Sequence, residues 1–455
     1  MNIQNKFDAP IPTSLDKIVK DMLHLAKQAG AQQAEAMMIV SRNVSVSVRD
    51  GKVEEVESSE SQDLGLRVLI GKKQSCVSTS DLSASSLEKM AERVCAMAKE
   101  APDDPYCGLA TPEQVQTSDM DLQKFDPSTV DMQQLIERAK EGEAAALAIA
   151  GVNLPATASA SFSLGSVCHR ASNGLHRAST NSFHGQSVLA FAEKDGAMER
   201  DWAQSGACWL EDIRCMQEIG LEAANRAIAR LGAKKGAGGT MAVMFEPRTA
   251  TTFVSMLLGA ITGSSVARGV SFLKDKKGQQ LFAGGFNIIE DPHRLRGSGS
   301  SLIDSEGFIR KPASIIENGY LNSWLHNLAS SRQLEETPTG HGATGIGSPP
   351  GIRPTNVYVT AGSKSPTELM LEVGKGLIVT DAFGASFNSG TGDWSVGVAG
   401  FYFEGDNRTT PFSEMTVAGN MLDIFKTLIP ASDLKFEQTV ETPSLLVPEL
   451  AVAGQ

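Results

Sequence analysis

Histidine side chains are the first candidates for chemistry in this sequence, because imidazole binds metal ions and exchanges protons near neutral pH. Seven histidines are present, and two of them, His169 and His176, flank the dipeptide Asn173-Gly174. This dipeptide favours a two-residue hairpin turn, and such a turn puts both imidazoles on one face of the hairpin. Cys168 then points to the other face, and no carboxylate in the hairpin completes a set of metal ligands. We therefore interpret both residues as half-buried or exposed strand histidines.

A loop rich in glycine and proline surrounds His341 and reads TPTGHGATGIGSPPGIRPTN. Its five glycines and four prolines let the backbone approach a ligand closely while restricting its freedom. We expect His341, Arg353 and Asn356 from this loop, together with Asp393, to be contact residues for a ligand. A plain connector between strands is the alternative. The Walker spacing G-x-x-x-x-G-K is absent, which argues against a phosphate-binding loop.

No arrangement of nucleophiles or paired acids identifies a catalytic centre. The sequence lacks the G-x-S-x-G elbow, and adjacent carboxylates such as Glu335 and Glu336 have the turn-like setting of surface charge. One unconventional possibility is a hydrolase whose metal is bound by His326, His341 and a carboxylate such as Asp393. From these residue types we assign no catalytic residue and no metal ligand to this chain.

Composition and charge exclude several classes of function. The chain has 455 residues, with 41 Lys plus Arg against 53 Asp plus Glu, and its net charge is −12. This charge repels phosphate backbones and no basic cluster is visible along the sequence, so we expect no nucleic-acid partner. No stretch approaches the roughly 18 apolar residues of a membrane span, and the first residues lack a secretory signal. Six cysteines without a C-x-x-C pair suit reduced thiols, so we expect a soluble cytoplasmic protein without membrane contact.

The elements that must position these residues begin with an α+β module over residues 1–101. Apolar residues at helical spacing predict one helix over 13–30 and a second over 83–101. Between the helices, valines alternate with polar residues, and the chain turns at Asp50-Gly51 and again at Gly71-Lys72. This pattern predicts antiparallel strands with helices packed on one face of the sheet.

A linker over roughly 102–121 leads to a second α+β segment over 122–235. Pro127 fits the first turn of its first helix, because the N–H that proline lacks has no partner inside the helix at that position. The histidine hairpin and a further helix follow. We place the main domain boundary at the glycine-rich hinge, residues 236–239.

Residues 240–455 predict a large, mainly antiparallel β domain with a few helices, so the fold class is α+β. Asn318-Gly319 marks a hairpin, and Ser365 with Glu368 has the spacing of a helix cap. A short apolar helix is predicted at the start of residues 253–265, just after a strand-like run. This stretch contains no His, Cys, Asp, Glu, Lys or Arg, which is unusual for a helix placed where it could carry chemistry.

Several long segments occur in an order that resembles one known family. In the second half they are ENGYLNSWLHNLASSRQL, TGHG, RPTNVYVTAG, GLIVTDAFGASFNSGTGDWSVGVAGFYFEG, PFSEMTVAGNMLDIFKTL and LLVPELAVAGQ, and in the first half GLRVLIGKKQSCVSTSDLSASSLEKMAE. These segments resemble the TldD/PmbA family of bacterial and archaeal peptide-processing proteins. The resemblance covers nearly the whole chain.

The resemblance implies a zinc site in the TldD type of subunit, on an H-E-x-x-x-H helix with a third ligand from a cysteine close to the C-terminus. On this chain the helix pattern falls on Val254, Ser255 and Gly259, and none of these side chains can replace its counterpart. No cysteine follows Cys215, and the place of the third ligand falls near Thr442. The chain therefore resembles the PmbA/TldE type of subunit.

What this resemblance implies is a non-catalytic subunit that pairs with a TldD-like chain and helps to enclose unfolded or precursor peptides. The candidate contacts to the peptide or the partner chain are then His341, Arg353, Asn356 and Asp393. Zinc is expected in the TldD-like partner, and no cofactor is expected in this chain. The alternative is a stand-alone homodimeric protein that binds peptides or regulates another protein, without protease activity.

Overall fold

The first half of the protein is built on one long sheet of six antiparallel strands, in the order β3-β2-β1-β4-β5-β6. This computed structural model describes residues 13–118, 120–128 and 130–454. β1 has a neighbouring strand on each side. One is β2, which follows it in the sequence, and the other is β4, which lies far along the sequence and pairs with most of β1. The strands are β1 Gln33–Arg49, β2 Lys52–Ile70, β3 Lys73–Thr79, β4 Thr157–Ala171, β5 His176–Lys194 and β6 Ala197–Ala207.

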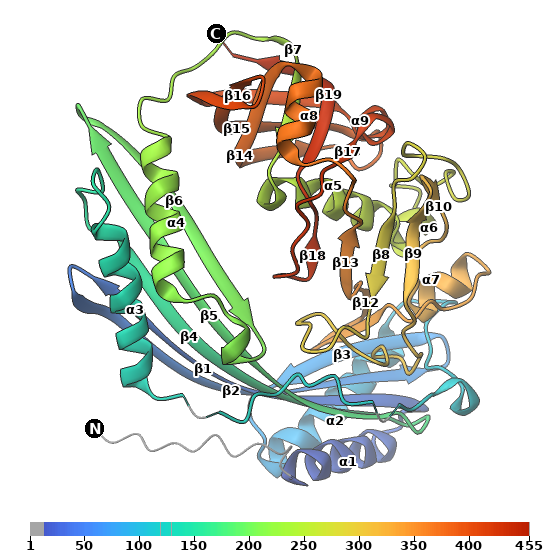
Figure 1. The fold of residues 1–455 in the computed structure, drawn as a ribbon. Coiled ribbons are helices and arrows are strands. Elements are labelled where there is room, and N and C mark those ends of the chain that lie inside the picture. Colours follow the sequence, from blue (N-terminus) through green and yellow to red (C-terminus); the bar gives the residue numbers. More distant parts are fainter. Residues whose placement is uncertain (1–12, 119, 129, 455) are drawn as a thin grey trace.

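Four helices cover one face of this sheet, two at each end (Figure 1). They are α1 Thr13–Gln28, α2 Ala84–Glu100, α3 Met132–Leu147 and α4 Met216–Ala229. Alternate residues of β1 explain this arrangement, because Ala36 and Met38 pack under α1 and α2, whereas Val46 and Val48 pack with α3 and α4. Two short 3-10 turns, Pro112–Gln114 and Leu210–Asp212, lie in the connections.

The opposite face of the long sheet is polar. The register places Ser45 of β1 beside Ser161 of β4, and the same alternation brings Ser, Asn and Gly to many positions of this face. Phe183 and Trp202 stand out, since each is 40% exposed. This face is turned toward the second half of the protein (Figure 1).

The hairpin between β4 and β5 differs from the sequence prediction by one register position. Arg170, not Ala171, pairs with His176, and the backbone N–H of Ala171 donates to the carbonyl of Leu175. The loop therefore has three residues and ends in a glycine with a φ angle of +98° at Gly174. As a result, the two histidines of the hairpin lie on opposite faces, and the prediction that they share one face is wrong.

The helix predicted to start near Pro127 begins later. Asp131 caps α3 by accepting from the backbone N–H of Gln134 at 2.8 Å, and Gln134 reaches back to the cap. This reciprocal capping sets the start of the helix at Met132, so Pro127 lies before the helix and not in its first turn.

The second half contains a closed barrel of five strands. β7 pairs with β14 and β19, β15 lies between β14 and β16, and pairing of β16 with β19 closes the ring. Only the β7–β14 pair of the ring is parallel, since the other pairs run antiparallel. The strands are β7 Gly239–Phe245, β14 Lys375–Phe387, β15 Asp393–Glu404, β16 Asn407–Asn420 and β19 Leu445–Ala453, with β17 Ile429–Pro430 beside β19.

Helices cover the barrel on the outside and at one end. The predicted cap is confirmed for α8, Pro366–Val373, because Ser365 and Glu368 exchange hydrogen bonds at its start. α8 packs on the outer face of β14 through Leu369 and Met370, α5 spans Pro247–Ala260, and α9 spans Met421–Thr427. Phe253 of α5 contacts Phe245 of β7 edge-on, with ring centroids 4.9 Å apart.

A second, smaller sheet joins this domain to the long sheet, in the order β10-β9-β8-β13-β18. Its strands are β8 Ile288–Asp291, β9 Ala313–Glu317, β10 Tyr320–Leu321, β13 Asn356–Val359 and β18 Val440–Glu441. The hairpin predicted at Asn318-Gly319 is confirmed, and both residues have positive φ angles. β11 Gly342–Gly345 and β12 Ser348–Ile352 form a hairpin that contacts β3. Two short helices, α6 Gly263–Ala267 and α7 Leu328–Gln333, contact each other.

The predicted α+β class is confirmed, and most strand pairs in the described chain are antiparallel. Within the described ranges, helices that combine the length and the apolar character of a membrane span are absent.

Candidate functional site

The short apolar helix predicted at the start of residues 253–265, which lacks His, Cys, Asp, Glu, Lys and Arg, is the second half of α5. Pro247 begins the helix at a position that needs no N–H donor, and the bidentate ion pair between Arg248 and Asp201 of β6 ties this end to the long sheet at 2.7 and 2.9 Å. Val254 is 2% exposed and packs in the core of the barrel domain. Ser255 and Gly259, one turn apart, are exposed on the outer side of the helix.

Open space surrounds Gly259, because a Cβ atom added there has no atom within 4 Å. The position implied for a C-terminal ligand also lies at this helix, since the hydroxyl of Thr442 donates to the carbonyl of Pro247 at 3.4 Å. Zinc in proteins is bound by thiolate, imidazole and carboxylate groups. Val254 and Gly259 carry no donor atom, and the hydroxyls of Ser255 and Thr442 are not typical zinc ligands, so these residues do not fit zinc.

His341 belongs to a buried network of hydrogen bonds. Its Nε2 lies 2.7 Å from Oε2 of Glu290, and its Nδ1 lies 2.8 Å from the hydroxyl of Thr339. The backbone N–H and the hydroxyl of Thr355 donate to the other oxygen of Glu290 at 2.6 and 2.7 Å. Burial opposes ionisation of Glu290, but the hydrogen bonds from His341 and Thr355 outweigh it and hold the pKa of this carboxyl below its ordinary value.

The other three predicted contact residues lie in different surroundings. Asn356 is fully buried and bonds to Ser300 and to the carbonyl of Asp291, both at 2.7 Å. Arg353 is exposed just after β12, and Asp393 is exposed at the start of β15. Contact of these residues with a peptide or partner chain remains a prediction.

The residues of the unconventional metal site do not come together. His326 lies 3.3 Å from Glu336, whereas His341 is paired with Glu290. Asp393 instead accepts hydrogen bonds from the side chains of Asn420 and of Thr391 in the loop before β15. Each group has its own partner, so the structure does not support a shared metal site for them.

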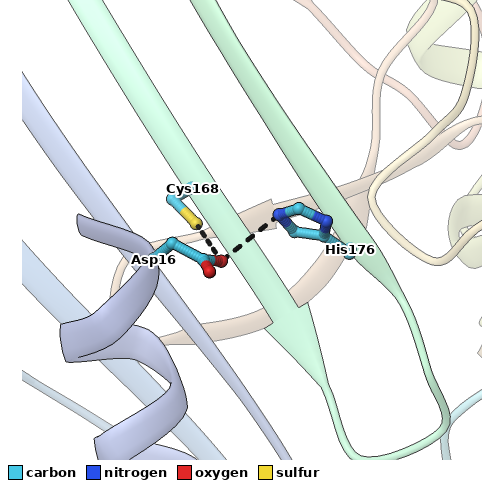
Figure 2. Close-up of side chains that lie close together, drawn as sticks. All are labelled: Asp16, Cys168 and His176. Carbon is cyan, nitrogen blue, oxygen red and sulfur yellow. Dashed lines mark hydrogen bonds and ion pairs between the residues drawn. The ribbon is translucent and has the colours of Figure 1, made fainter. Parts of the chain in front are cut away.

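One group of metal-type ligands lies elsewhere, between α1 and the β4–β5 hairpin (Figure 2). In the described part of the chain, Asp16, Cys168 and His176 place one ligand atom each within 4.8 Å of one another. Two cations already bind the carboxylate of Asp16, however, at 2.5 Å from Arg170 and 2.6 Å from Lys20. Burial raises the pKa of the Cys168 thiol to about 11. We therefore interpret this group as an ion-pair network that holds α1 on the sheet.

A second charged network is buried where the β11–β12 hairpin meets the polar face of the long sheet. Glu35 accepts from Arg67 at 2.6 Å, and His169 lies 3.4 Å away. Burial opposes ionisation of Glu35, but Arg67 and His169 outweigh it and lower the pKa of this carboxyl to about 2. Nearby, burial and the charge of Asp304 raise the pKa of Glu306 to about 8.

This network was not predicted from the sequence, although a signal was present. Glu35 and Arg67 interrupt the apolar runs QAEAMM and LGLRVLI, and charged residues inside strands of this kind are buried only when they are paired.

Sequence comparison now identifies the family. Profiles described as PmbA/TldA metallopeptidase domain 1, central domain and C-terminal domain match residues 34–98, 125–231 and 238–454. Metalloprotease PmbA of Escherichia coli O157:H7 is 32% identical over 97% of this chain and 96% of its own length. This chain belongs to the PmbA/TldD family. A metalloprotease PmbA homologue of Haemophilus influenzae is 31% identical to this PmbA/TldD chain, again over 97% of it and 96% of the homologue.

Solved structures share the PmbA/TldD fold at lower identity. A proposed modulator of DNA gyrase from Bacteroides thetaiotaomicron has a TM-score of 0.90 at 23% identity, with 98% of this chain and 100% of that chain covered. TldE from Thermococcus kodakarensis has a TM-score of 0.81 at 17% identity, with 96% and 100% covered. At these identities the two neighbours show the fold alone.

Proposed function

We propose that this chain is a non-catalytic subunit of the PmbA/TldE type in a cytoplasmic metallopeptidase that processes unfolded or precursor peptides. A TldD-like partner chain carries the zinc and the proteolytic centre in this proposal. The observation that supports it is the chemistry of α5, where Val254, Ser255 and Gly259 occupy the positions that the resemblance to TldD-type chains assigns to the metal-binding motif.

The local packing favours a metal site whose ligands have been replaced over a metal site that forms only after a rearrangement. Val254 faces the core, so a rearrangement that exposes this position would open the packing of Phe253 against Phe245. Thr442 lies beside the first residue of the same helix. The fold therefore still brings the helix and the C-terminal segment together, without side chains that bind zinc there.

The proposed role of this chain is to shape the space around the peptide. The polar face of the long sheet presents serine and asparagine side chains that can bond to an extended backbone, and Phe183 and Trp202 provide exposed aromatic surface on the same face. Such a face can hold many peptide sequences, because backbone hydrogen bonds do not depend on side-chain identity.

Reconstitution tests the proposal directly. The purified chain is mixed with a TldD-type subunit, and cleavage of an unfolded peptide is measured with and without a metal chelator. We expect cleavage only in the mixture, and we expect the chelator to abolish it. Size-exclusion chromatography with light scattering reports whether the two chains form one complex.

The stand-alone alternative predicts a different set of results. A homodimer that binds peptides alone would self-associate, would not join the TldD-type chain, and would not increase proteolysis on mixing. Peptide cleavage by this chain alone, abolished by chelator, would contradict both readings.

A further inference from the structure

Four cationic residues from four segments lie near the loop between β8 and β9, where hydrogen bonds link three of them to residues 298–302 and the fourth to one of these three. We call them the cation cluster. They come from the linker before α3, the second residue of β5, the same β8–β9 loop and the segment after β12, and are Lys124, Arg177, Arg310 and Arg353.

Two members of the cluster are fixed by the residues of this loop. The Nζ atom of Lys124 donates to the carbonyls of Ser298 and Ser300 at 3.0 and 2.9 Å. Arg177 lies on the polar face of the long sheet, and its Nη2 donates weakly to the hydroxyl of Ser301 at 3.4 Å. The remaining N–H groups of the Arg177 guanidinium have no hydrogen-bond partner among the described residues.

The other two members are linked to each other. Arg310 is 6% exposed, its backbone N–H donates to the carbonyl of Leu302 at 2.9 Å, and its Nη1 donates to the carbonyl of Arg353 at 3.2 Å. The Nε of Arg310 is buried and has no hydrogen-bond partner. Arg353 itself is exposed, so the cluster extends from a buried guanidinium to the surface.

The cation cluster lacks the carboxylate partners that Arg67 and Arg248 have. Arg67 and Arg248 each contact a carboxylate at 2.6–2.9 Å, whereas no carboxylate in the described residues forms an ion pair with the cation cluster. Asp304 and Glu290 are the nearby acids, but the oxygens of both already have other hydrogen-bond partners. Burial, together with the charges of Arg310 and Arg353, lowers the pKa of Arg177 to about 10 against the opposing effect of Asp304.

A purely structural role explains this arrangement poorly. Gathering like charges and burying an unpaired N–H both cost free energy, and a protein with a net charge of −12 has many carboxylates available for pairing. Planar guanidinium groups match carboxylate and phosphate oxygens through paired hydrogen bonds, and such charge-assisted bonds are strong.

We propose that the cation cluster is a binding site for a small oxyanion, and that its ligand is the carboxylate at the C-terminus of a bound peptide. The carboxylate enters past the exposed Arg353 and accepts from the unpaired N–H groups of Arg177 and Arg310. This assignment of the ligand rests on the proposed function, whereas the oxyanion site itself does not. A free phosphate offers the same oxygen geometry, so the experiment separates the two sources.

The test uses the full-length chain alone and two peptides of identical sequence, one with a free C-terminal carboxylate and one with a C-terminal amide. Fluorescence anisotropy of the labelled peptides gives their affinities, and inorganic phosphate is added as a competitor. We expect the amide to bind at least about tenfold more weakly, and we expect this difference to disappear in Arg177→Gln and Arg353→Gln. Phosphate should displace the carboxylate peptide.

Lys311→Gln is the matched control, because it removes a positive charge from the exposed residue next to Arg310 and should preserve the tenfold difference. Arg353→Gln changes an exposed side chain, so the test stands even if Arg177→Gln fails to fold. If phosphate raises the melting temperature of the parent chain but not of Arg353→Gln, while both peptides bind equally, the oxyanion site is supported and the peptide carboxylate is excluded as its ligand. Equal binding of both peptides without any effect of phosphate would overturn the site. No cleavage is measured, so failure here is distinct from failure of the proposed peptidase role.

Discussion

Glu306 offers a sharp test of the electrostatics at the junction between the two halves of the protein. This carboxyl is 7% exposed, and one of its oxygens accepts from the backbone N–H of Leu328 at 2.7 Å. Burial and the negative charge of Asp304 raise its pKa from 4.5 to about 8. The folded protein therefore keeps a proton on Glu306 at pH values where the unfolded chain has released it.

The sign of the pH dependence follows from this difference. Below about pH 4.5 the carboxyl is protonated in both states, and its effect on stability is constant. As the pH rises from 4.5 toward 8, only the folded state holds the proton, so the free energy of unfolding falls. A shift of about 3.5 pKa units, at 1.36 kcal/mol each, corresponds to an upper limit of about 5 kcal/mol lost by about pH 8.5.

Glu306→Gln removes this titration while an amide oxygen can still accept from Leu328. We expect the variant and the parent chain to have similar stabilities at about pH 5, and we expect the variant to be more stable by several kcal/mol at about pH 8.5. Urea denaturation followed by tryptophan fluorescence and circular dichroism at both pH values measures the difference. Glu449→Gln, at an exposed position, is the control and should not change the pH dependence. Parallel stability curves for Glu306→Gln and the parent chain would refute the reasoning.

Three further substitutions test local packing and pairing. Gly263→Ala should destabilise the protein by about 1–3 kcal/mol or more in thermal denaturation, because the new Cβ would lie 2.3 Å from Nδ1 of His326. Gly259→Ala, its control in open space, should be neutral or stabilising by up to about 1 kcal/mol, and equal effects at both glycines would contradict the packing. His341→Ala should cost about 3–5 kcal/mol in urea denaturation because it leaves Oε2 of the buried Glu290 carboxylate without its imidazole partner. Peptidase activity of the mixed complex should stay largely intact in folded His341→Ala, and its collapse to background would show that this chain supplies a catalytic group.

The sequence predicted those features that depend on neighbouring residues. Apolar spacing indicated α1, the Asn318-Gly319 turn indicated its hairpin, and Ser365 with Glu368 indicated the start of α8. The Asn173-Gly174 hairpin shows the limit of this reasoning, because the same dipeptide fits a two-residue turn or the end of a three-residue loop. The choice between the two changed the face on which His176 lies.

Features that depend on distant pairing were not predictable from local patterns. Closure of the barrel requires β16 to pair with β19, and neither strand carries a signal for its partner. The cation cluster likewise joins residues as far apart as Lys124 and Arg353, which is why no basic cluster was visible along the sequence. By contrast, the identity of the residues at 254, 255 and 259 was fully available from the sequence, and the structure adds that Val254 faces the core.

The proposed function requires that this chain has no zinc site of its own and that catalysis depends on a partner chain. Metal analysis of the purified full-length chain, before and after assembly with a TldD-type subunit and saturation with zinc, tests this claim most directly. We predict no stoichiometric zinc in the chain alone and about one zinc per heterodimer after assembly, as one catalytic zinc site implies. Close to one tightly held zinc per chain in the isolated protein, bound by its own side chains, would contradict the account.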